Sequence, residues 1–386
     1  MKTATLKGNT THSVLYDYGL IWALVMLLGF GLVMVYSASI ALAQADPLVG
    51  YRGEYFFGRQ LILLCVGLLV SAVIFRVPMA VWNQWAWLLF LLGIFSLLLV
   101  LVPKIGYAVN GSRRWIHLGM TLQPSEFMKL FVVLYAADFV VRKKEYMNDV
   151  KRGFIPLLVA MLLVGFELLL EPDFGAFLVM MLIAISLLFL GGLPIRYFIL
   201  LLAISLAGFV SLVVLSPYRL ARLLWFWNPW ADPYGKGYQL THALIAFGHG
   251  GFLGMGLGGS VEKQLYLPEA HTDFLLAVIA EELGLFGVLL VLGLFAFVVW
   301  RAFKIGWGAV LTDRPFDALV AQGIGLWFGI QGIINMGVNE GLLPTKGLTL
   351  PLLSYGGSGI IANMVAATLL LRIDHESRLL MWKRAP

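Results

Sequence analysis

Leu267-Pro-Glu-Ala-His-Thr-Asp273 stands immediately before a long apolar run, and this junction decides how the chain must fold. The apolar run is long enough to cross a bilayer, yet it still carries Glu281 and Glu282. Carboxylates are costly to desolvate in a membrane, so those found there are functional candidates. We therefore expect a membrane-spanning helix over Thr272–Trp300 whose outer end carries the chemistry of the protein.

The composition is that of an integral membrane protein. Of the 386 residues, 60% are hydrophobic and only 12% are charged, whereas soluble domains are nearer half apolar and a quarter charged. The net charge of +6 would suit nucleic acid or an anionic membrane surface. Its distribution favours the membrane, and no nucleic-acid partner is expected. Cys65 is the only cysteine, which excludes an internal disulfide, and the long first apolar run argues against a cleavable signal peptide.

Apolar segments of about 20 residues, the length that crosses a bilayer, recur along the whole chain. We expect an all-α polytopic membrane protein, a single domain over 1–386 with ten transmembrane helices and tails at 1–19 and 372–386. The predicted spans are Leu20–Ala43, Phe57–Phe75, Val81–Val102, Pro124–Val141, Phe154–Leu170, Phe174–Leu193, Tyr197–Leu215, Thr272–Trp300, Phe316–Val338 and Tyr355–Leu371.

The distribution of Lys and Arg predicts the orientation. Basic residues are concentrated in the tails and in alternate short loops, such as Arg142-Lys-Lys144, which is typical of cytoplasmic segments. Both termini are therefore expected in the cytoplasm of a cell with an inner membrane. The loops at 103–123, 171–173, 216–272 and 339–354 then face the periplasm, and so does the active site.

The large periplasmic loop, about 216–272 between the seventh and eighth helices, is too long to be a simple connection. Its Tyr218–Trp230 segment places Arg219 and Arg222 on one face of an interfacial helix, which indicates a membrane anchor or, as the alternative, a substrate contact. Gly254-Met-Gly-Leu-Gly-Gly259 fits a dinucleotide pattern, but no strand precedes it. Tight turns or a close approach to a lipid headgroup explain these glycines better.

Asp273 has two interpretations. After Thr272 as a helix cap, an acid in the first turn would simply complement the helix dipole. Alternatively it is a catalytic base at the membrane surface. Glu281 and Glu282 are expected to hold neighbouring helices together rather than to react.

A second group of charges lies around the fourth helix. Glu126 and Lys129 can pair on one helical face or contact substrate. Arg113 and Arg114 precede them in an outer loop and would suit an oxyanion such as phosphate, or a lipid headgroup.

Two outer connections carry further polar residues. Glu171-Pro-Asp-Phe-Gly175 is expected to be an architectural turn. The apolar, glycine-rich stretch 339–358 indicates a re-entrant segment packed within the protein, from which Lys346 and Ser354 could reach a polar cavity. No metal-ligand cluster, no P-loop and no Walker-type motif is evident, so no cofactor is expected, and a divalent cation such as Mg²⁺ is left open.

Together these motifs resemble the SEDS family of cell-wall polymerases. The resemblance runs nearly end to end, and Pro344-Thr-Lys-Gly-Leu-Thr-Leu-Pro351 is closer to the FtsW branch of that family than to the RodA branch. The motifs that carry it are Tyr36-Ser-Ala-Ser39, Gly111-Ser-Arg-Arg-Trp115, Gln123-Pro-Ser-Glu126, Glu171-Pro-Asp-Phe-Gly175, Leu267-Pro-Glu-Ala-His-Thr-Asp-Phe274 and Ser354-Tyr-Gly-Gly-Ser358.

The resemblance implies a peptidoglycan glycosyltransferase that polymerises lipid II on the outer face of the inner membrane during septal cell-wall synthesis. It implies that Asp273 is the general base on the acceptor hydroxyl. The other expected partners are a class B penicillin-binding protein, further division proteins and membrane lipids. We assign pyrophosphate binding to Arg114, Arg113, Lys129, Glu126 and Lys346, and supporting roles to His271, Glu269, Glu281 and Ser354.

Two other classes of function stay open from the sequence. A lipid II flippase would also need many helices with intramembrane charges, although transporters usually show repeated halves with a site at mid-membrane. A non-catalytic scaffold for cell division would need no outer polar cavity.

Overall fold

A computed structural model describes residues 15–109, 112–118 and 120–384. Within the helices and strands, the side chains of Val109, Leu118, Met120, Pro217, Tyr218, Arg219, Arg222 and Arg384 lie outside this description. The structure therefore does not test the prediction that Arg219 and Arg222 share one helical face. Gly111 of the Gly111–Trp115 motif and most of the tail at 1–19 also lie outside the described residues.

Each of the ten predicted spans corresponds to a helix. These helices are α1 (Tyr18–Ala45), α2 (Tyr55–Ile74), α3 (Met79–Leu101), α4 (Pro124–Arg142), α5 (Ile155–Leu170), α6 (Phe174–Leu190), α7 (Ile195–Val214), α10 (Leu275–Leu311), α11 (Pro315–Asn339) and α12 (Ser358–Arg384). Among the described residues, seven helices are long and apolar enough to cross a membrane, namely α1, α2, α3, α5 with the turn before it, α7, α10 and α11. The shorter α6 is also apolar.

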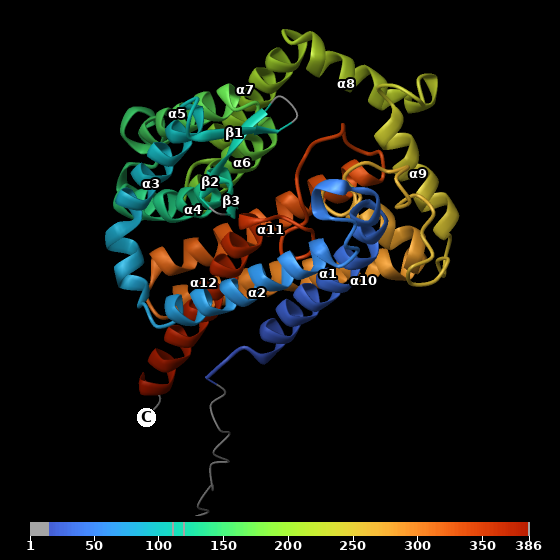
Figure 1. Ribbon diagram of the computed structural model, residues 1–386. Coiled ribbons are helices and arrows are strands. Elements are labelled where there is room, and N and C mark those ends of the chain that lie inside the picture. The colour runs from blue at the N-terminus through green and yellow to red at the C-terminus, as the bar shows by residue number, and fades with distance from the viewer. Residues whose placement is uncertain (1–14, 110–111, 119, 385–386) are drawn as a thin grey trace, which may run out of the picture.

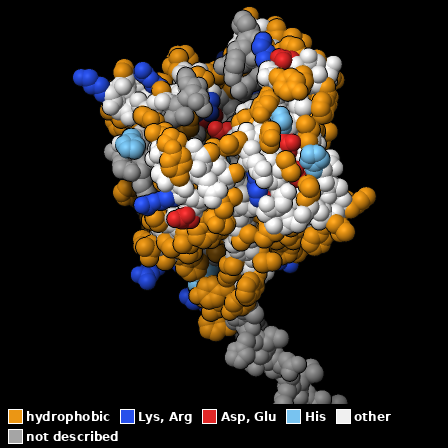
Figure 2. Space-filling model, turned by 45° about the vertical axis from the view of Figure 1, so that its right-hand side comes forward, with side chains coloured by type: hydrophobic (Ala, Val, Ile, Leu, Met, Phe, Trp, Pro, Cys, Tyr) orange, Lys and Arg blue, Asp and Glu red, His pale blue; other side chains and the backbone are white. Residues whose placement is uncertain are grey.

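The helices form two groups that share one core. Figure 1 shows α3 to α7 on one side and α1, α2, α10 and α12 on the other. Helix α11 contacts α4 and α6 as well as α10 and α12, so it joins the two groups. Trp327 and Phe328 of α11 are fully buried at this junction. On the face that Figure 2 shows, hydrophobic side chains gather on the lower part and along the edges.

The prediction of an all-helical chain missed a small antiparallel sheet in the first outer loop. Its strands are β1 (Gly106–Val109), β2 (Ser112–Leu118) and β3 (Met120–Leu122), in the order β1-β2-β3. Gly106 is required where the sheet meets α3, because a Cβ there would lie 1.8 Å from the carbonyl oxygen of Val100. The sheet places Arg113 and Arg114 on its middle strand, β2, and β3 connects that strand to α4.

The predicted single helix from Thr272 to Trp300 is wrong in its outer part. Helix α10 begins at Leu275 and is broken at Gly284, whose φ of 65° and ψ of −159° are not helical. The backbone of Gly254 packs closely against this break. A Cβ added to Gly284 would lie only 2.5 Å from the nitrogen of Gly254. Leu275 to Glu282 form a separate, buried helical segment, so Glu281 and Glu282 lie beside a kink rather than inside a straight span.

The long outer loop is largely ordered. It contains α8 (Pro217–Trp227) and α9 (Tyr238–Gly250), and Figure 1 shows α8 reaching from α7 towards α9. The glycines that follow α9 make tight turns, as expected, with positive φ at Gly254, Gly256 and Gly258. Their close approach is to the backbone of α10: Met255 N donates to Glu281 O, and Gly256 N donates to Glu282 O, each at 2.9 Å.

Candidate functional site

A cavity of about 920 Å³ lies between the two helix groups at the outer loops. It brings together residues from β2, α4, the α5–α6 turn, α7, the segment before α10 and the loop after α11. Of the predicted site residues, its walls contain Arg114, Glu126, Glu269, Asp273 and Lys346. The space-filling view shows a hollow with acidic side chains inside it (Figure 2).

Asp273 lies one residue before the cap of α10. The helix begins with Phe274 as its cap residue and has no acid in its first turn. Thr272 does not cap the helix: its hydroxyl donates to a carboxylate oxygen of Glu269 at 2.8 Å. The interpretation of Asp273 as a helix-dipole acid therefore loses its structural basis, and its half-buried carboxylate lines the cavity instead.

Two cationic side chains face the same cavity. The Lys346 ammonium lies 4.3 Å from the ring centroid of Phe174, and it comes from the loop after α11. Arg114 donates from Nε to the carbonyl oxygen of Glu171 at 3.3 Å and from its terminal nitrogen to the carbonyl oxygen of Pro172. These bonds fix the guanidinium against the α5–α6 turn. Arg113 is exposed on β2 and is absent from the cavity wall.

Glu126 is held at the cavity wall by a fully buried cation. The Lys129 ammonium is 2.8 Å from Glu126 Oε1 and 2.8 Å from Gln331 Oε1, and it faces the ring of Trp327 at 5.2 Å. Lys129 is 0% exposed and does not line the cavity. Its place in the structure is therefore behind Glu126. A Cβ on Gly359 would lie 3.0 Å from Glu126 Oε2, so glycine at this position leaves room for the carboxylate.

The α5–α6 turn was expected to be purely architectural, but it also joins α4 and contains a buried carboxylate. Asp173 caps α6 through Ala176 N and also accepts a hydrogen bond from the Ser125 hydroxyl at 3.0 Å, which joins the turn to α4. Glu171 is fully buried, and neither of its carboxylate oxygens has a hydrogen-bond partner among the described residues. Burial, and then the negative charge of Asp173, raises the pKa of Glu171 to about 9.

Replacing Glu171 with Gln is expected to stabilise the protein in a pH-dependent way. The pKa is raised from an ordinary 4.5 to about 9, so the folded state retains a proton that the unfolded chain releases. Stability is then lost as the pH rises through this window, and the variant escapes that loss. Its thermal midpoint in detergent should exceed that of the wild type at about pH 8, and the difference should shrink towards about pH 5.

The exposed Glu145 provides the control, because Glu145→Gln should leave the midpoint unchanged at every pH. A constant difference between Glu171→Gln and the wild type across the pH range would contradict a protonated, buried Glu171.

Two of the residues that were expected to support the site, His271 and Ser354, do not line its cavity. His271 is buried against the rings of Phe56 and Tyr355, at 4.6 and 5.4 Å between centroids, and burial lowers its pKa. Ser354 stabilises its own loop by accepting a hydrogen bond from Leu350 N at 3.1 Å. The loop is packed within the protein as expected, since Leu348, Leu350 and Ser354 are buried.

Glu281 organises the long outer loop. It accepts hydrogen bonds from the Ser260 hydroxyl at 2.5 Å and from the backbone nitrogens of Val261 and Glu262 at 3.1 and 3.2 Å. The Nδ1 atom of His249 lies 3.2 Å from Glu281 Oε1. Glu281 therefore holds loop backbone against α10 and is absent from the wall of the large cavity.

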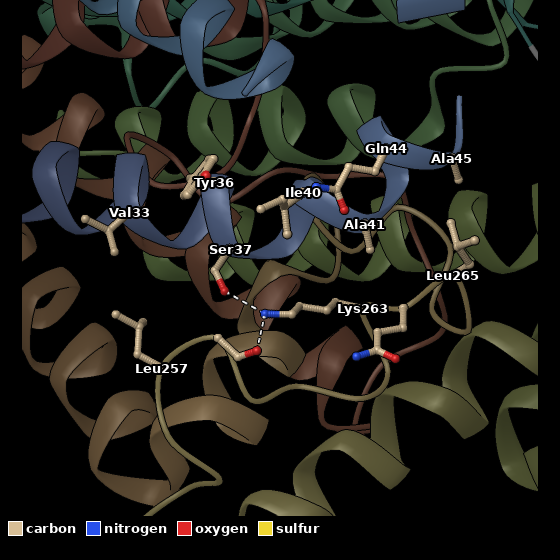
Figure 3. A pocket seen from close by; sticks show the side chains of 12 residues that line it. Val33, Tyr36, Ser37, Ile40, Ala41, Gln44, Ala45, Leu257, Lys263 and Leu265 are labelled. Atoms are coloured by element: carbon tan, nitrogen blue, oxygen red, sulfur yellow. Dashed lines mark hydrogen bonds between the residues drawn. The ribbon is translucent and has the colours of Figure 1, made fainter. Parts of the chain in front are cut away.

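A second hollow, of about 710 Å³, lies between α1 and residues 257–265 (Figure 3). Lys263 extends into it and donates to Ser37 Oγ at 2.9 Å, to Gly258 O at 2.8 Å and to Glu282 Oε1 at 2.7 Å. The buried Glu282 thus ties α10 to α1 and to the loop, which agrees with its expected role between helices. No sequence pattern predicted that Lys263 would be the partner of Glu282.

One wall of the large cavity is apolar and borders the membrane-facing surface. It is formed by α7, which contributes Leu206, Phe209, Val210, Val213 and Val214. Most of α7 is exposed, with only Leu201 and Val213 buried. The polar cavity that Asp273 and Glu126 line is thus continuous with a long apolar surface.

Three amide side chains of α11 escaped the sequence analysis, although their spacing was a signal. Gln331, Asn335 and Asn339 recur every four residues and so share one face of the helix. Gln331 reaches Lys129, whereas Asn335 and Asn339 reach the segment that carries Asp273. Among the described residues, no group of three or more His, Cys, Asp or Glu side chains is arranged to hold a metal ion.

Comparison with known proteins gives consistent matches over the whole chain. A family model for cell cycle proteins that bears the names FtsW, RodA and SpoVE matches residues 18–379. A probable peptidoglycan glycosyltransferase FtsW from Aromatoleum aromaticum is 56% identical over 360 residues, covering 93% of this chain and 88% of that protein. The protein of the same name from Burkholderia thailandensis is 54% identical over 369 residues, covering 95% and 80%.

Solved structures match as well. A chain from a peptidoglycan synthase complex that coordinates polymerization and crosslinking has a TM-score of 0.76 and 31% identity, and the match covers 94% of this chain and 98% of that one. The rod shape determining protein RodA from Thermus thermophilus has a TM-score of 0.67 and 28% identity, covering 94% and 97%.

Proposed function

The chain belongs to the family of FtsW, RodA and SpoVE cell cycle proteins, and we propose that it is a peptidoglycan glycosyltransferase with Asp273 as its general base. It is a multi-pass membrane protein. One observation carries the assignment of the site: a half-buried carboxylate, two fixed cations and an apolar wall line one cavity.

The substrate that fits these features is lipid II, a disaccharide-pentapeptide linked to a polyprenyl tail through pyrophosphate. The acceptor's 4-hydroxyl attacks the anomeric carbon of the donor, the carbon–oxygen bond to pyrophosphate breaks, and the hydroxyl proton passes to the Asp273 carboxylate. The polyprenyl pyrophosphate leaves as an anion and needs no proton from the enzyme. One base and a set of cations are therefore sufficient, in contrast to the two carboxylates of a glycoside hydrolase.

Lys346 and Arg114 are placed to stabilise the departing pyrophosphate. Both line the cavity, and contacts hold each of them there: Lys346 lies over the Phe174 ring and Arg114 donates to two backbone carbonyls. Pre-oriented cations are effective where negative charge develops. The polyprenyl tail would lie along the apolar wall of α7, which borders the same cavity. Glu126, oriented by Lys129, would shape the opposite wall.

We propose ten spans with both termini in the cytoplasm, as the distribution of Lys and Arg predicts, and two buried ion pairs agree with the length of one such span. Arg301 pairs with Asp17 before the start of α1, and Lys263 and Ser37 meet Glu282 further along α1. About 20 residues separate Asp17 from Ser37, roughly 30 Å of helix, which equals the thickness of the hydrocarbon core. Asp273 lies beyond the Ser37 end, so the cavity would open to the periplasm from the inner membrane.

The place of this enzyme in septal synthesis would require a partner that crosslinks the new strands. The similarity to a chain of a complex that couples polymerization to crosslinking supports a class B penicillin-binding protein in that role. Other division proteins would recruit the pair to the septum.

Polymerisation of labelled lipid II by the purified protein, alone and with its transpeptidase, tests the proposed activity. Glycan strands resolved by gel electrophoresis are the expected product. Flipping of lipid II in proteoliposomes without any strand formation would identify a transporter instead. Neither strands nor flipping, with or without the transpeptidase, would favour a scaffold.

Replacing Lys346 with Met is expected to lower kcat/KM for lipid II by about tenfold to a hundredfold, since a hydrogen bond to a charged group contributes about 1.5–3 kcal/mol. The change removes the ammonium group and leaves an unbranched, uncharged side chain that is one atom shorter. Steady-state polymerisation at varied lipid II concentration measures the effect. Lys236 lies exposed in the outer loop, and Lys236→Met is the matched control. Equal kcat/KM for the two variants would remove Lys346 from the site.

A further inference from the structure

Asn335 and Asn339 occupy the last two turns of α11 and are almost completely buried, at 1% and 0% exposure. They lie four residues apart and face the segment that precedes α10. Buried amides in an apolar helix are costly unless every hydrogen bond is made. Their partners therefore indicate what the two residues stabilise.

The amide nitrogen of Asn335 connects the two segments that carry the base and the cation. It donates to the carbonyl oxygen of Asp273 at 2.8 Å and to that of Leu348 at 2.5 Å. An amide nitrogen has two protons, so both are used. Leu348 is two residues from Lys346, and this one side chain thus fixes the spacing between the backbone of Asp273 and the Lys346 loop.

Asn339 completes the arrangement. Its amide nitrogen also donates to the carbonyl oxygen of Asp273, at 2.9 Å, and its side-chain oxygen accepts from Ala277 N at 3.2 Å. The Ala277 N–H belongs to the first turn of α10, and it also donates to the carbonyl oxygen of the cap residue Phe274 at 3.0 Å. Asn339 therefore holds the start of α10 and the residue before it in one position.

The space between the two segments is narrow. A Cβ added to Gly347 would lie 3.1 Å from Asp273 Oδ2, which places the carboxylate directly against the loop that carries Lys346. A shift of the loop by a few tenths of an ångström would displace the carboxylate. Efficient proton transfer depends on such positions, and a misplacement of about 1 Å lowers a rate by about a hundredfold.

We propose that Asn335 and Asn339 are positioning residues for the reaction, which hold the Asp273 main chain and the Lys346 loop at a fixed separation. This inference rests on the proposed function of Asp273 and extends it to side chains that do not line the cavity. The two amides share one acceptor, the Asp273 carbonyl, so either alone retains part of the constraint and loss of both releases it.

The test is a double-mutant cycle on Asn335→Leu and Asn339→Leu, assayed by lipid II polymerisation. Each single variant is expected to lower kcat by about tenfold with KM for lipid II nearly unchanged. The double variant should lose more than the product of the two single losses, because only then is the Asp273 carbonyl without an amide donor from α11. Asn363 of α12 is buried to 3% exposure, and Asn363→Leu is the matched control with wild-type kcat.

Thermal midpoints of all variants are measured together with the rates. A fall in kcat that follows the loss of folded protein, or a rise in KM at constant kcat, would overturn the positioning role. Wild-type kcat in both Asn variants would do the same while leaving the polymerase itself intact. Absence of strands from the wild-type protein would instead refute the proposed function.

Gly347→Ala provides a second variant that does not disturb the buried amides. Gly347 is exposed and its backbone does not require glycine, so the variant is expected to fold normally. The new Cβ should displace the Asp273 carboxylate and lower kcat severalfold at unchanged KM, on the order of 3- to 10-fold. An unchanged kcat in Gly347→Ala would show that the separation of the two segments does not control the reaction.

Discussion

Asp273→Asn is expected to lower kcat for lipid II polymerisation by about 10²- to 10⁴-fold, the contribution of a positioned general base. Asparagine has the same shape and lines the cavity in the same way, but it cannot accept the proton of the acceptor hydroxyl. The main-chain carbonyl of residue 273, which Asn335 and Asn339 bind, is unaffected by the change. The fold and the affinity for lipid II should therefore be retained.

The comparison requires kcat, the Kd for labelled lipid II and the thermal midpoint of the same preparations. Asp313, in the exposed turn between α10 and α11, provides the control, and Asp313→Asn should behave as the wild type. Strand synthesis by Asp273→Asn at the wild-type rate would exclude this carboxylate from the mechanism.

The second large effect is expected on stability, at the buried pair of Glu126 and Lys129. Lys129→Met leaves a buried carboxylate and the Gln331 oxygen without their common partner. Breaking a buried ion pair from one side costs about 3–5 kcal/mol. A loss of this size corresponds to a fall of roughly 10 °C in the thermal midpoint of a protein of this class.

The double variant Glu126→Gln with Lys129→Met separates structure from function. It leaves no unpaired charge, so most of the lost stability should return. Activity should remain low if the cavity requires the Glu126 carboxylate, which the assignment of this residue to the site predicts. Recovery of both stability and polymerisation would show that the pair only holds helices together. A thermal midpoint of Lys129→Met equal to the wild type would contradict the buried pair itself.

The helices could be predicted from the sequence because a bilayer selects apolar segments of a fixed length, and each of the ten predicted segments corresponds to a helix. The kink at Gly284 could not. Glycine within an apolar run is compatible with a straight helix, and the break depends on the backbone of Gly254, which lies far away in the sequence. The three-stranded sheet was missed because its strands are short and carry arginines, so no alternation of polar and apolar residues marks them.

Several residues that the sequence analysis assigned to the site line one cavity, but their connections were not predicted. Arg114, Glu126, Asp273 and Lys346 stood out because charges are rare beside apolar segments, and the structure brings them to one cavity. Lys129 lies behind the cavity wall because α4 packs against α11, where Gln331 binds the ammonium.

Pairings between distant residues depend on tertiary structure in the same way. Lys263 meets Glu282 only because the long loop returns to α10, and no local pattern encodes that contact. The amides at Asn335 and Asn339 did have a periodic signal, but only their contacts explain it.

The pH dependence of kcat in the wild type and in Asp273→Asn tests the central claim most directly. A base must be ionised to accept a proton, so the wild-type rate should fall at acidic pH as Asp273 becomes protonated. The small residual rate of Asp273→Asn should lack this acidic limb. The same acidic limb in both proteins, at comparable rates, would show that another group takes the proton and would contradict the account.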